Sequence, residues 1–419
     1  MNTPSLRFKE FSDEWEEKKL GEIGDLKTSS VDKLIRENEN IVNLVNYMDV
    51  YKHKSINSSN VNKLMRVSAK ENQILGNSLK RGDILFTPSS ETPDDIGHSI
   101  VIFEDLPNTL YSYHLIRFRP VEKMDIGYEH YFCNHLKVLK QLSKFATGAT
   151  RYTISIKDFE KVKINIPSIQ EQNKIAAFLS LVDKRIELQE EKINKLELYK
   201  KGLMQKIFNQ EIRFKDDSEN NYPEWEEKEL GEIGFFKTSS VDKLIRGNEN
   251  IVNLVNYMDV YKHKSINSSN VDNLMRVSAK ENQILGNSLK RGDILFTPSS
   301  ETPDDIGHSI VIFEDLPNTL YSYHLIRFRP VEKMDIGYEH YFCNHLKVLK
   351  QLSKFATGAT RYTISIKDFE KVKINIPVIQ EQRKISSLLS LLDLKTQKEQ
   401  LKHQQLNNLK KGLLQQIFV

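Results

Sequence analysis

Residues 144–153, with the sequence KFATGATRYT, gather the side chains best suited to nucleic-acid contact, and an identical segment fills residues 354–363. An arginine can donate two hydrogen bonds to a guanine edge or bind a phosphate, and lysine and threonine side chains suit phosphates. A glycine permits close approach of the backbone to a ligand. We therefore expect DNA contacts from Lys144, Thr147, Gly148, Thr150, Arg151, Tyr152 and Thr153, and from Lys354, Thr357, Gly358, Thr360, Arg361, Tyr362 and Thr363. The residues alone leave open a helix-to-strand turn whose threonines satisfy backbone groups.

Two shorter groups of polar residues are further candidates for DNA contact. Short hydroxyl side chains follow an apolar run in the segment TPSSET, and a basic cluster with an aromatic residue occurs in YKHK. Hydroxyl groups suit groove and phosphate contacts, and ammonium groups suit phosphates. The competing interpretations are an ordinary polar loop and a solvated charged face. The candidates are Ser89, Ser90, Lys52 and Lys54 in the first half and Ser299, Ser300, Lys262 and Lys264 in the second.

The sequence carries no recognisable spacing of a catalytic, cofactor or metal site. It has no phosphate-cradling glycine loop, no dinucleotide fingerprint and no nucleophile–base constellation. His130 and Cys133 share a helix face, but His135 lies five residues from the first and points elsewhere, which argues against zinc. We therefore expect no catalytic residue, no cofactor and no bound metal.

The sequence repeats itself, because residues 20–167 and residues 230–377 align without a gap at an offset of 210 residues. Such near-identity predicts two copies of one folded module with the same surface chemistry. A chain built this way suits a ligand with two equivalent halves, and duplex DNA, with its two-fold related strands, is the obvious candidate. The five positions that differ are Asp25/Phe235, Leu26/Phe236, Glu37/Gly247, Asn62/Asp272 and Lys63/Asn273.

The composition is typical of a soluble globular protein, with 39% hydrophobic and 28% charged residues among 419. The net charge of +4 is small, so affinity for DNA has to come from local basic patches. The first residues lack the apolar core of a signal peptide, and no stretch is long enough to span a membrane. The two cysteines, Cys133 and Cys343, occupy the same position in the two copies, which favours free thiols in a reducing, cytoplasmic compartment.

Each copy mixes strand and helix patterns. A helical spacing of apolar residues predicts one helix over residues 127–146. Ser155 is expected to cap a short helix that follows. Runs rich in Ile, Val, Phe and Tyr, or alternating with polar residues, predict strands over residues 83–88, 99–104, 113–120 and 163–166.

After each module the apolar period changes to the three-four spacing of a coiled-coil seam. Polar residues such as Gln189 and Lys200 interrupt the seam, and we expect these residues to set its register. A helix of about forty residues is roughly 60 Å long, and its apolar stripe needs a partner. We expect the two long helices to pair with each other. The seam consists of Leu179, Val182, Ile186, Ile193, Leu196 and Leu203 in the first helix and Leu389, Leu392, Leu406 and Leu413 in the second.

We therefore predict an α+β chain with two mixed α/β recognition modules separated by two long antiparallel coiled-coil helices, with pseudo-two-fold symmetry. A parallel pairing is disfavoured, because the linker would have to return along the whole helix pair. The expected domains are residues 1–167 and 223–377 for the two modules, 168–208 and 378–419 for the two long helices, and 209–222 for the linker.

This order of motifs resembles the specificity subunit of type I restriction–modification enzymes. The segment WEEKKLGEI at residues 15–23 looks like the entry motif of that family, and RGDIL at residues 81–85 resembles its turn and strand. The segment IPSIQEQ at residues 166–172 resembles its helix entry. All three segments recur in the second copy with few changes, so the resemblance covers essentially the whole chain.

The resemblance implies a DNA-reading protein without catalysis of its own. In that family each module, called a target recognition domain, reads one half of a split site in double-stranded DNA. The paired helices act as a spacer and as a docking surface for two methyltransferase subunits, and restriction subunits join that complex. Family members usually carry two different modules. Nearly identical modules imply the same half-site on opposite strands, so we predict an interrupted palindrome, whereas modules related by translation would read a direct repeat.

Two other classes of function are the alternatives. A single-chain nuclease with two pseudo-symmetric modules would use Asp94, Asp95 and Glu104 as metal ligands, but the acid-x-Lys strand of such a site is missing nearby. A coiled-coil adaptor would read no DNA, and a strong salt dependence of DNA binding would count against it.

Overall fold

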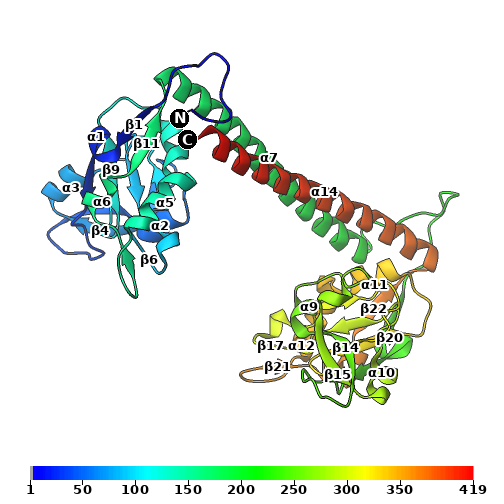
Figure 1. Cartoon of the computed structure of the whole chain (residues 1–419). Helices are drawn as coiled ribbons and strands as arrows, with labels where there is room; N and C mark the ends of the chain where they lie inside the picture. Colours follow the sequence, from blue (N-terminus) through cyan, green and yellow to red (C-terminus); the bar gives the residue numbers. More distant parts are fainter. Residues whose placement is uncertain (1–2, 419) are drawn as a thin grey trace. The chain divides into compact units, whose positions relative to one another are not determined.

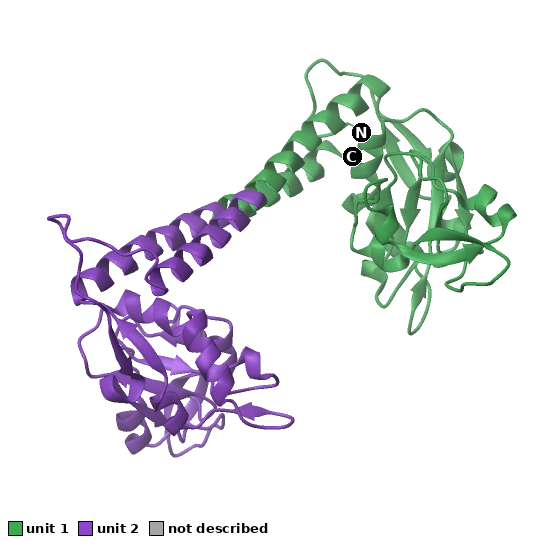
Figure 2. Cartoon of the chain, turned by 180° about the vertical axis from the view of Figure 1, so that it is seen from behind, with its two compact units in different colours: residues 1–190, 401–419 green, residues 191–400 purple. Residues whose placement is uncertain are grey.

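The structure is a computed structural model that describes residues 3–418. The chain divides into two compact units, which Figure 2 colours separately. Unit 1 contains the residues up to 190 and those from 401 onwards, and unit 2 contains residues 191–400. Each unit therefore combines one copy of the repeated module with parts of two long helices that are distant in sequence. Within the described part of the chain, no helix combines the length and apolar character that crossing a membrane requires.

The strands of the module in unit 1 form small sheets (Figure 1). One four-stranded antiparallel sheet has the order β2 (Gly24–Thr28), β9 (Ile116–Pro120), β5 (Ile84–Phe86) and β7 (Ser99–Val101). A three-stranded sheet has the order β4 (Met65–Ala69), β3 (Asn40–Val45) and β8 (Thr109–Tyr111), and β3 and β8 are parallel. Two-stranded sheets join β1 (Glu16–Lys19) to β11 (Lys163–Ile166) and β6 (Ser89–Ser90) to β10 (Tyr152–Thr153).

The module in unit 2 repeats this topology strand for strand. Its four-stranded sheet has the order β13 (Gly234–Thr238), β20 (Ile326–Pro330), β16 (Ile294–Phe296) and β18 (Ser309–Val311). Its three-stranded sheet has the order β15 (Met275–Ala279), β14 (Asn250–Val255) and β19 (Thr319–Tyr321). Its two-stranded sheets join β12 (Glu226–Glu229) to β22 (Lys373–Ile376) and β17 (Ser299–Ser300) to β21 (Tyr362–Thr363).

Short helices connect these strands, and one long helix follows each module. The helices up to the first long one are α1 (Leu20–Ile23), α2 (Tyr47–Tyr51), η1 (Val61–Lys63), α3 (Glu71–Asn77), η2 (Pro93–Asp95), α4 (Ile126–Cys133), α5 (Leu136–Phe145), α6 (Ile156–Phe159) and α7 (Ile169–Phe208). Their counterparts are α8 (Leu230–Ile233), α9 (Tyr257–Tyr261), η3 (Val271–Asn273), α10 (Glu281–Asn287), η4 (Pro303–Asp305), α11 (Ile336–Cys343), α12 (Leu346–Phe355), α13 (Ile366–Glu370) and α14 (Ile379–Ile417).

Strand β5 lies between two hydrophobic cores of the first module. Its three residues are fully buried, and successive side chains of a strand point to opposite faces of the sheet. Ile84 and Phe86 belong to the larger core, whereas Leu85 belongs to a second core. The continuous apolar run that predicted this strand is therefore explained by burial on both faces.

The structure confirms most of the predicted elements and corrects one of them. Strands β5, β7, β9 and β11 lie within the predicted runs, and the Ser155 hydroxyl accepts the Asp158 backbone N–H at 3.3 Å to cap α6. The single helix predicted over residues 127–146 is wrong, because the chain forms α4 and α5 with a break at Asn134 and His135. Leu136, which lies within the predicted helix and begins α5, is 43% exposed.

The helix breaks because Asn134 is engaged elsewhere. Its side-chain amide donates to the Ser99 carbonyl, and its side-chain carbonyl accepts the Ser99 backbone N–H, both at 3.1 Å. The next residue, His135, has an extended backbone, and its ring Nδ1 accepts the Lys137 N–H at 3.4 Å as the cap of α5. The sequence could not show this break, because it depends on a tertiary contact with β7.

The ends of the long helices complete the module cores. In unit 1, Ile417 and Phe418 are 4% exposed and lie in the same core as Trp15, and the Phe418 ring lies 5.4 Å from that of Tyr128. In unit 2, Phe208 occupies the same position beside Tyr338, with ring centroids 5.7 Å apart. Each module therefore buries the end of a long helix that begins after the other module.

Within each unit the two long helices run antiparallel. In unit 2, Lys192 pairs with Glu399 at 3.0 Å and Lys200 pairs with Asp393, so the residue numbers rise along α7 as they fall along α14. In unit 1, Lys410 pairs with Asp183 at 2.6 Å, and Leu179 shares a core with Ile417. The pairing of Lys200 across the helices agrees with the register role expected for this polar seam position. The apolar seam residues from Leu179 to Leu203 and from Leu389 to Leu413 are all buried or half-buried.

We expect Phe418→Ala to destabilise unit 1, because truncating a buried phenylalanine typically costs about 3–5 kcal/mol. Urea unfolding followed by near-ultraviolet circular dichroism measures the loss. The matched control is Leu409→Ala on the same helix, where the side chain is 53% exposed and the expected change is small. Equal unfolding curves for the two variants would contradict the burial of the Phe418 ring.

Candidate nucleic-acid interface

The structure brings the first two candidate groups of the sequence together in one small sheet. Strand β10 pairs with β6 in antiparallel register, so Tyr152 lies opposite Ser90 and Thr153 opposite Ser89. Thr147 and Thr153 exchange two backbone hydrogen bonds of 3.0 and 2.9 Å, which closes the residues between them into a hairpin loop. In Figure 1 the equivalent loop before β21 projects from the body of unit 2.

Gly148 is required by the turn of this hairpin. Its φ is +148°, and a Cβ atom placed there would lie 2.0 Å from the Arg151 carbonyl oxygen. A side chain at this position would therefore force the hairpin open. The same values recur at Gly358. Gly148 thus allows the backbone at residue 148 to pack closely against the backbone at Arg151, in addition to allowing a ligand to approach.

Arg151 is exposed on the hairpin and is held by a neutral partner. Its Nη2 donates to the Ser89 hydroxyl oxygen at 3.0 Å. In unit 2, the Arg361 Nε and Nη2 donate to the Ser299 hydroxyl oxygen at 3.3 and 3.0 Å. Among residues 3–418, no carboxylate forms an ion pair with either arginine. The positive charge thus stays available for an anionic ligand such as a phosphate.

The candidate serines are structural parts of this surface, not exposed groups. Ser89 is 8% exposed and Ser90 is 5% exposed. The Ser90 hydroxyl donates to the Thr92 carbonyl oxygen, and the Ser89 hydroxyl accepts from Arg151. The equivalent Ser299 and Ser300 are buried in the same way.

The remaining candidates differ in how free their charges are. Lys144, Thr147, Thr150 and Thr153 are exposed, as is Lys52 at the end of α2. The Lys54 ammonium pairs with Asp49 at 2.6 Å, and the Lys264 ammonium pairs with Asp259 at the same distance. Half of the charge in the YKHK cluster is therefore neutralised by the protein itself, which makes Lys52 and Lys262 the better candidates for phosphate contact.

A cluster of rings beside β6 was not predicted from the sequence. The Tyr47 and Tyr51 rings stack with centroids 5.9 Å apart, and the Tyr51 and His98 rings are 4.7 Å apart. The Tyr47 hydroxyl donates to the Ser89 carbonyl at 2.6 Å. Tyrosines four residues apart on a helix share a face, so their spacing was a usable signal. Their contact with Ser89 was not, because it joins residues 42 positions apart.

Electrostatic coupling places further groups near Arg151. Burial lowers the pKa of His114, and the charges of Lys33 and Arg151 lower it further. Burial raises the pKa of Tyr47, and the nearby Asp95 carboxylate adds to the rise while Arg151 opposes it. The charge of Arg151 therefore acts on both Tyr47 and His114, and these two groups are uncharged near neutral pH.

The side chains considered for metal or nuclease chemistry do not assemble into a site. Among the described residues, no group of three or more His, Cys, Asp or Glu side chains is placed to hold a metal ion. Burial raises the pKa of the Cys133 thiol well above its usual value, so it is neither a nucleophile nor a ready ligand. Asp94 accepts from Ser143, Asp95 from Tyr51, and Glu104 from Ser58.

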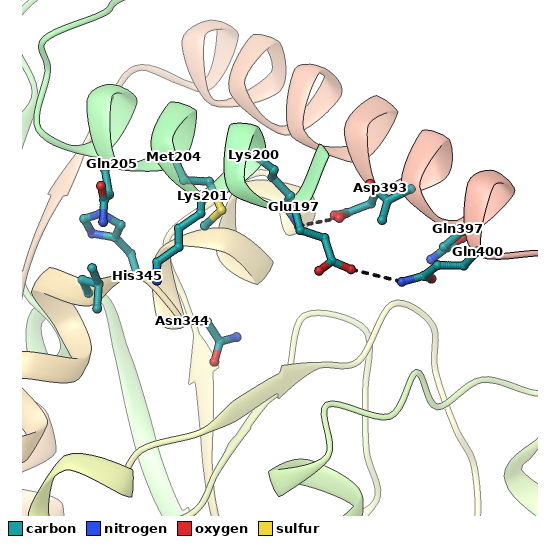
Figure 3. Close-up of a pocket in the computed structure, with 12 residues that line it drawn as sticks. Glu197, Lys200, Lys201, Met204, Gln205, Asn344, His345, Asp393, Gln397 and Gln400 are labelled. Atoms are coloured by element: carbon teal, nitrogen blue, oxygen red, sulfur yellow. Dashed lines mark hydrogen bonds and ion pairs between the residues drawn. The ribbon is translucent and has the colours of Figure 1, made fainter. Parts of the chain in front are cut away.

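A hollow lies in unit 2 beside the long helices (Figure 3). It has a volume of 530 Å³, and polar side chains of α7 and α14 line it together with the junction of α11 and α12. Lys200 pairs with Asp393, and the Gln400 amide donates to Glu197 at 3.2 Å. Burial lowers the pKa of His345 to about 4, which leaves this ring neutral. The lining of the hollow holds no nucleophile–base pair.

Comparison with known proteins decides the family. Residues 12–198 and 222–410 match the family model described as the type I restriction modification DNA specificity domain. The chain belongs to this family. It is a DNA-specificity subunit of the type I restriction–modification class and therefore a non-catalytic protein. The resemblance stated from the sequence motifs is confirmed, and the nuclease and adaptor alternatives are not favoured.

Two similar proteins are themselves named as specificity subunits. The MjaX specificity subunit of a type I restriction enzyme from Methanocaldococcus jannaschii, as that protein is named, is 26% identical over 330 residues, covering 74% of this chain and 72% of that one. The MjaVIII specificity subunit of the same organism is 23% identical over 319 residues, covering 70% of each chain.

Two solved structures show the fold. The S subunit of a type I system from M. genitalium has a TM-score of 0.51 at 17% identity, covering 100% of this chain and 99% of that one. A chain from a structure of type I restriction–modification complex assembly has a TM-score of 0.62 at 17% identity, covering 96% of both. The mixed α+β fold with one long helix after each module is thereby established for the specificity subunit.

Each module also buries an acid that makes its stability depend on pH. Glu129 in α4 is 3% exposed, and its Oε2 has no hydrogen-bond partner among the described residues. Burial, aided by the charge of Asp125, raises the pKa of Glu129 to about 8, and Glu339 behaves alike. Because the folded state favours the protonated acid, its contribution to stability is complete below the usual pKa of 4.5 and is lost as the pH rises towards 8.

We expect Glu129→Gln combined with Glu339→Gln to remove this pH dependence, because the amide stays neutral. The free energy of unfolding should exceed that of the unmodified chain by more than about 1 kcal/mol at pH 8.5, with little gain at pH 4.5. Urea titrations at both pH values measure the difference. The exposed Glu37→Gln serves as the control, and a constant offset between pH 4.5 and 8.5 would refute the assignment.

Proposed function

We propose that this specificity subunit reads an interrupted palindrome, with its two modules binding the same half-site on opposite strands. The observation that carries the proposal is the identity of the two hairpin surfaces. In unit 2, β17 pairs with β21 in the register of β6 and β10, and Arg361 bonds Ser299 at the distance found for Arg151 and Ser89. Equal surfaces present equal hydrogen-bond donors to a base pair.

The five differences between the copies support this proposal, because they fall outside the hairpin segments. Asp25 lies in β2 and pairs with the buried Arg117 at 3.3 Å. In the second copy, Arg327 instead lies over the Phe235 ring, with its carbon Cζ 6.0 Å from the centroid. The substitution thus replaces an ion pair of a buried arginine with a contact between its guanidinium and an aromatic ring. The other differences lie in the edge strand β2, before β3 and in η1.

The direction of the long helices supports reading on opposite strands. Within each unit α7 and α14 run antiparallel. A direct repeat would be expected only for modules related by translation. The preferred reading is therefore two inverted half-sites separated by bases that the modules do not contact.

The catalytic partners in this proposal are two methyltransferase subunits, and restriction subunits join them. Membership of the family supports the partner classes, and two equivalent modules support two methyltransferase copies. The hollow beside α7 and α14 in unit 2 is a candidate contact surface for such a subunit. The unpaired, buried thiols of Cys133 and Cys343 support work in the reducing cytoplasm.

The proposal is tested by Arg151→Ala combined with Arg361→Ala in the assembled methyltransferase complex. A well-placed arginine–base contact contributes about 1–3 kcal/mol of discrimination, so each lost contact should weaken binding of the target duplex roughly 5–150-fold. Fluorescence anisotropy with the target duplex and methylation mapping in cells measure the effect. Methylation of the target should be lost.

The control is Lys18→Ala combined with Lys228→Ala. These lysines are paired with Glu122 and Glu332 at 2.8 and 2.7 Å, so their charges are already neutralised on the protein. Binding should change little, and the salt dependence should stay the same. Unchanged methylation in the arginine variant would remove the hairpin from the DNA contacts.

A further inference from the structure

Arg151 is exposed on the hairpin, and neighbouring groups also hold its side chain in place. A free arginine side chain loses up to about 2 kcal/mol of conformational entropy when it becomes fixed, and that cost falls if the protein already holds it in place. Groups that hold the guanidinium before DNA binds therefore lower this cost. In both units the guanidinium contacts an equivalent serine, Ser89 for Arg151 and Ser299 for Arg361.

The Ser89 hydroxyl is the immediate partner of the guanidinium. It accepts from the Arg151 Nη2 at 3.0 Å, and Ser299 accepts from two nitrogens of Arg361 at 3.3 and 3.0 Å. A charged donor makes such a hydrogen bond stronger than a neutral one. A serine can hold the guanidinium without neutralising it, whereas a carboxylate in its place would compete with phosphate and bases for the charge.

The guanidinium keeps enough donors for DNA while Ser89 holds it. It carries five N–H groups, and the contact with Ser89 in unit 1 uses one nitrogen. A bidentate contact with guanine uses two N–H groups. Arg151 can therefore keep its hydrogen bond to Ser89 while it contacts a guanine base.

Ser89 is in turn fixed from its other side by Tyr47. The Tyr47 hydroxyl donates to the Ser89 carbonyl at 2.6 Å, and Tyr257 donates to the Ser299 carbonyl at 2.8 Å. The Tyr47 ring stacks on Tyr51 at an interplanar angle of 17°, and the Tyr51 hydroxyl donates to Asp95 at 2.9 Å. This series of contacts connects α2 and η2 to the short strand that carries Ser89.

We propose that Ser89 and Tyr47, with Ser299 and Tyr257 in the second module, are positioning residues that hold Arg151 and Arg361 for DNA reading. Ser89 restrains the guanidinium directly, and Tyr47 fixes the backbone of Ser89. Neither residue needs to touch DNA, which agrees with the burial of Ser89. The inference rests on the proposed function of the hairpin arginines.

The test uses the complete complex with its methyltransferase subunits and a duplex that contains the mapped target. Ser89→Ala combined with Ser299→Ala removes the hydroxyl that holds the guanidinium in each module. At about 0.5–1.5 kcal/mol for a hydrogen bond, binding of the target should weaken about threefold to tenfold for each module. Binding of an unrelated duplex should stay within about twofold, because phosphate contacts elsewhere are kept. Tyr47→Phe combined with Tyr257→Phe keeps the rings and removes the hydroxyls, and it should act in the same direction. Ser89→Thr with Ser299→Thr keeps the hydroxyls and should restore binding.

A double-mutant cycle separates positioning from a general structural role. In the Arg151→Ala and Arg361→Ala background, the serine substitutions should cause no further loss of target binding, because the group they position is absent. A loss of equal size in both backgrounds would overturn the proposal. Ser68→Ala with Ser278→Ala is the control, since it removes a buried hydroxyl that bonds Glu39 or Glu249 and should leave target binding unchanged.

The outcomes also separate this inference from the proposed function. If the arginine variant loses target binding and the serine variant does not, the hairpin reads DNA without help from Ser89, and the positioning proposal is wrong. If the arginine variant binds normally, the proposed reading by the hairpin fails and the positioning proposal fails with it. Melting temperatures of all variants within about 2 °C of the unmodified complex show that the binding losses do not come from unfolding.

Discussion

The structure depends on the insertion of a helix end into the core of each module. Phe418 lies against Tyr128 in unit 1, and Phe208 lies against Tyr338 in unit 2. A single long helix cannot bury its apolar stripe alone, and a module that lacks the inserted ring would have a gap in its core. Each unit therefore requires chain segments that lie far apart in sequence, and folding of one half of the protein is tied to the presence of the other.

The proposed DNA-reading surface belongs to a module whose core includes an inserted helix end. With its core completed, the module holds β6 and β10 together, and this small sheet carries Arg151 beside Ser89. The arginine charge is not paired with an acid in the described residues, and the groups that hold it are neutral. Within residues 3–418, no group of three or more His, Cys, Asp or Glu side chains is placed to hold a metal ion. This arrangement supports the proposed role of the hairpin in DNA recognition.

The sequence predicted the parts that depend on local pattern. The repeat predicted two modules and the three-four period predicted the long helices. The residue types of segment 144–153 indicated DNA contact, which stays a prediction. The break after α4 was missed because Asn134 is held by β7, a contact that no helical period can reveal. The pairing of Arg151 with Ser89 was missed for the same reason, since 62 residues separate them. The sequence predicts DNA contact by Ser89 and Ser90, whereas strand pairing buries both side chains.

The central claim is that one surface, present twice, reads one half-site twice. The most direct measurement is the methylation pattern of a genome in cells that express this chain with its methyltransferase subunits, determined by single-molecule sequencing. The account predicts one interrupted motif that is identical on both strands when each is read in the same chemical direction. A motif whose two halves differ in sequence, or whose halves form a direct repeat, would contradict it.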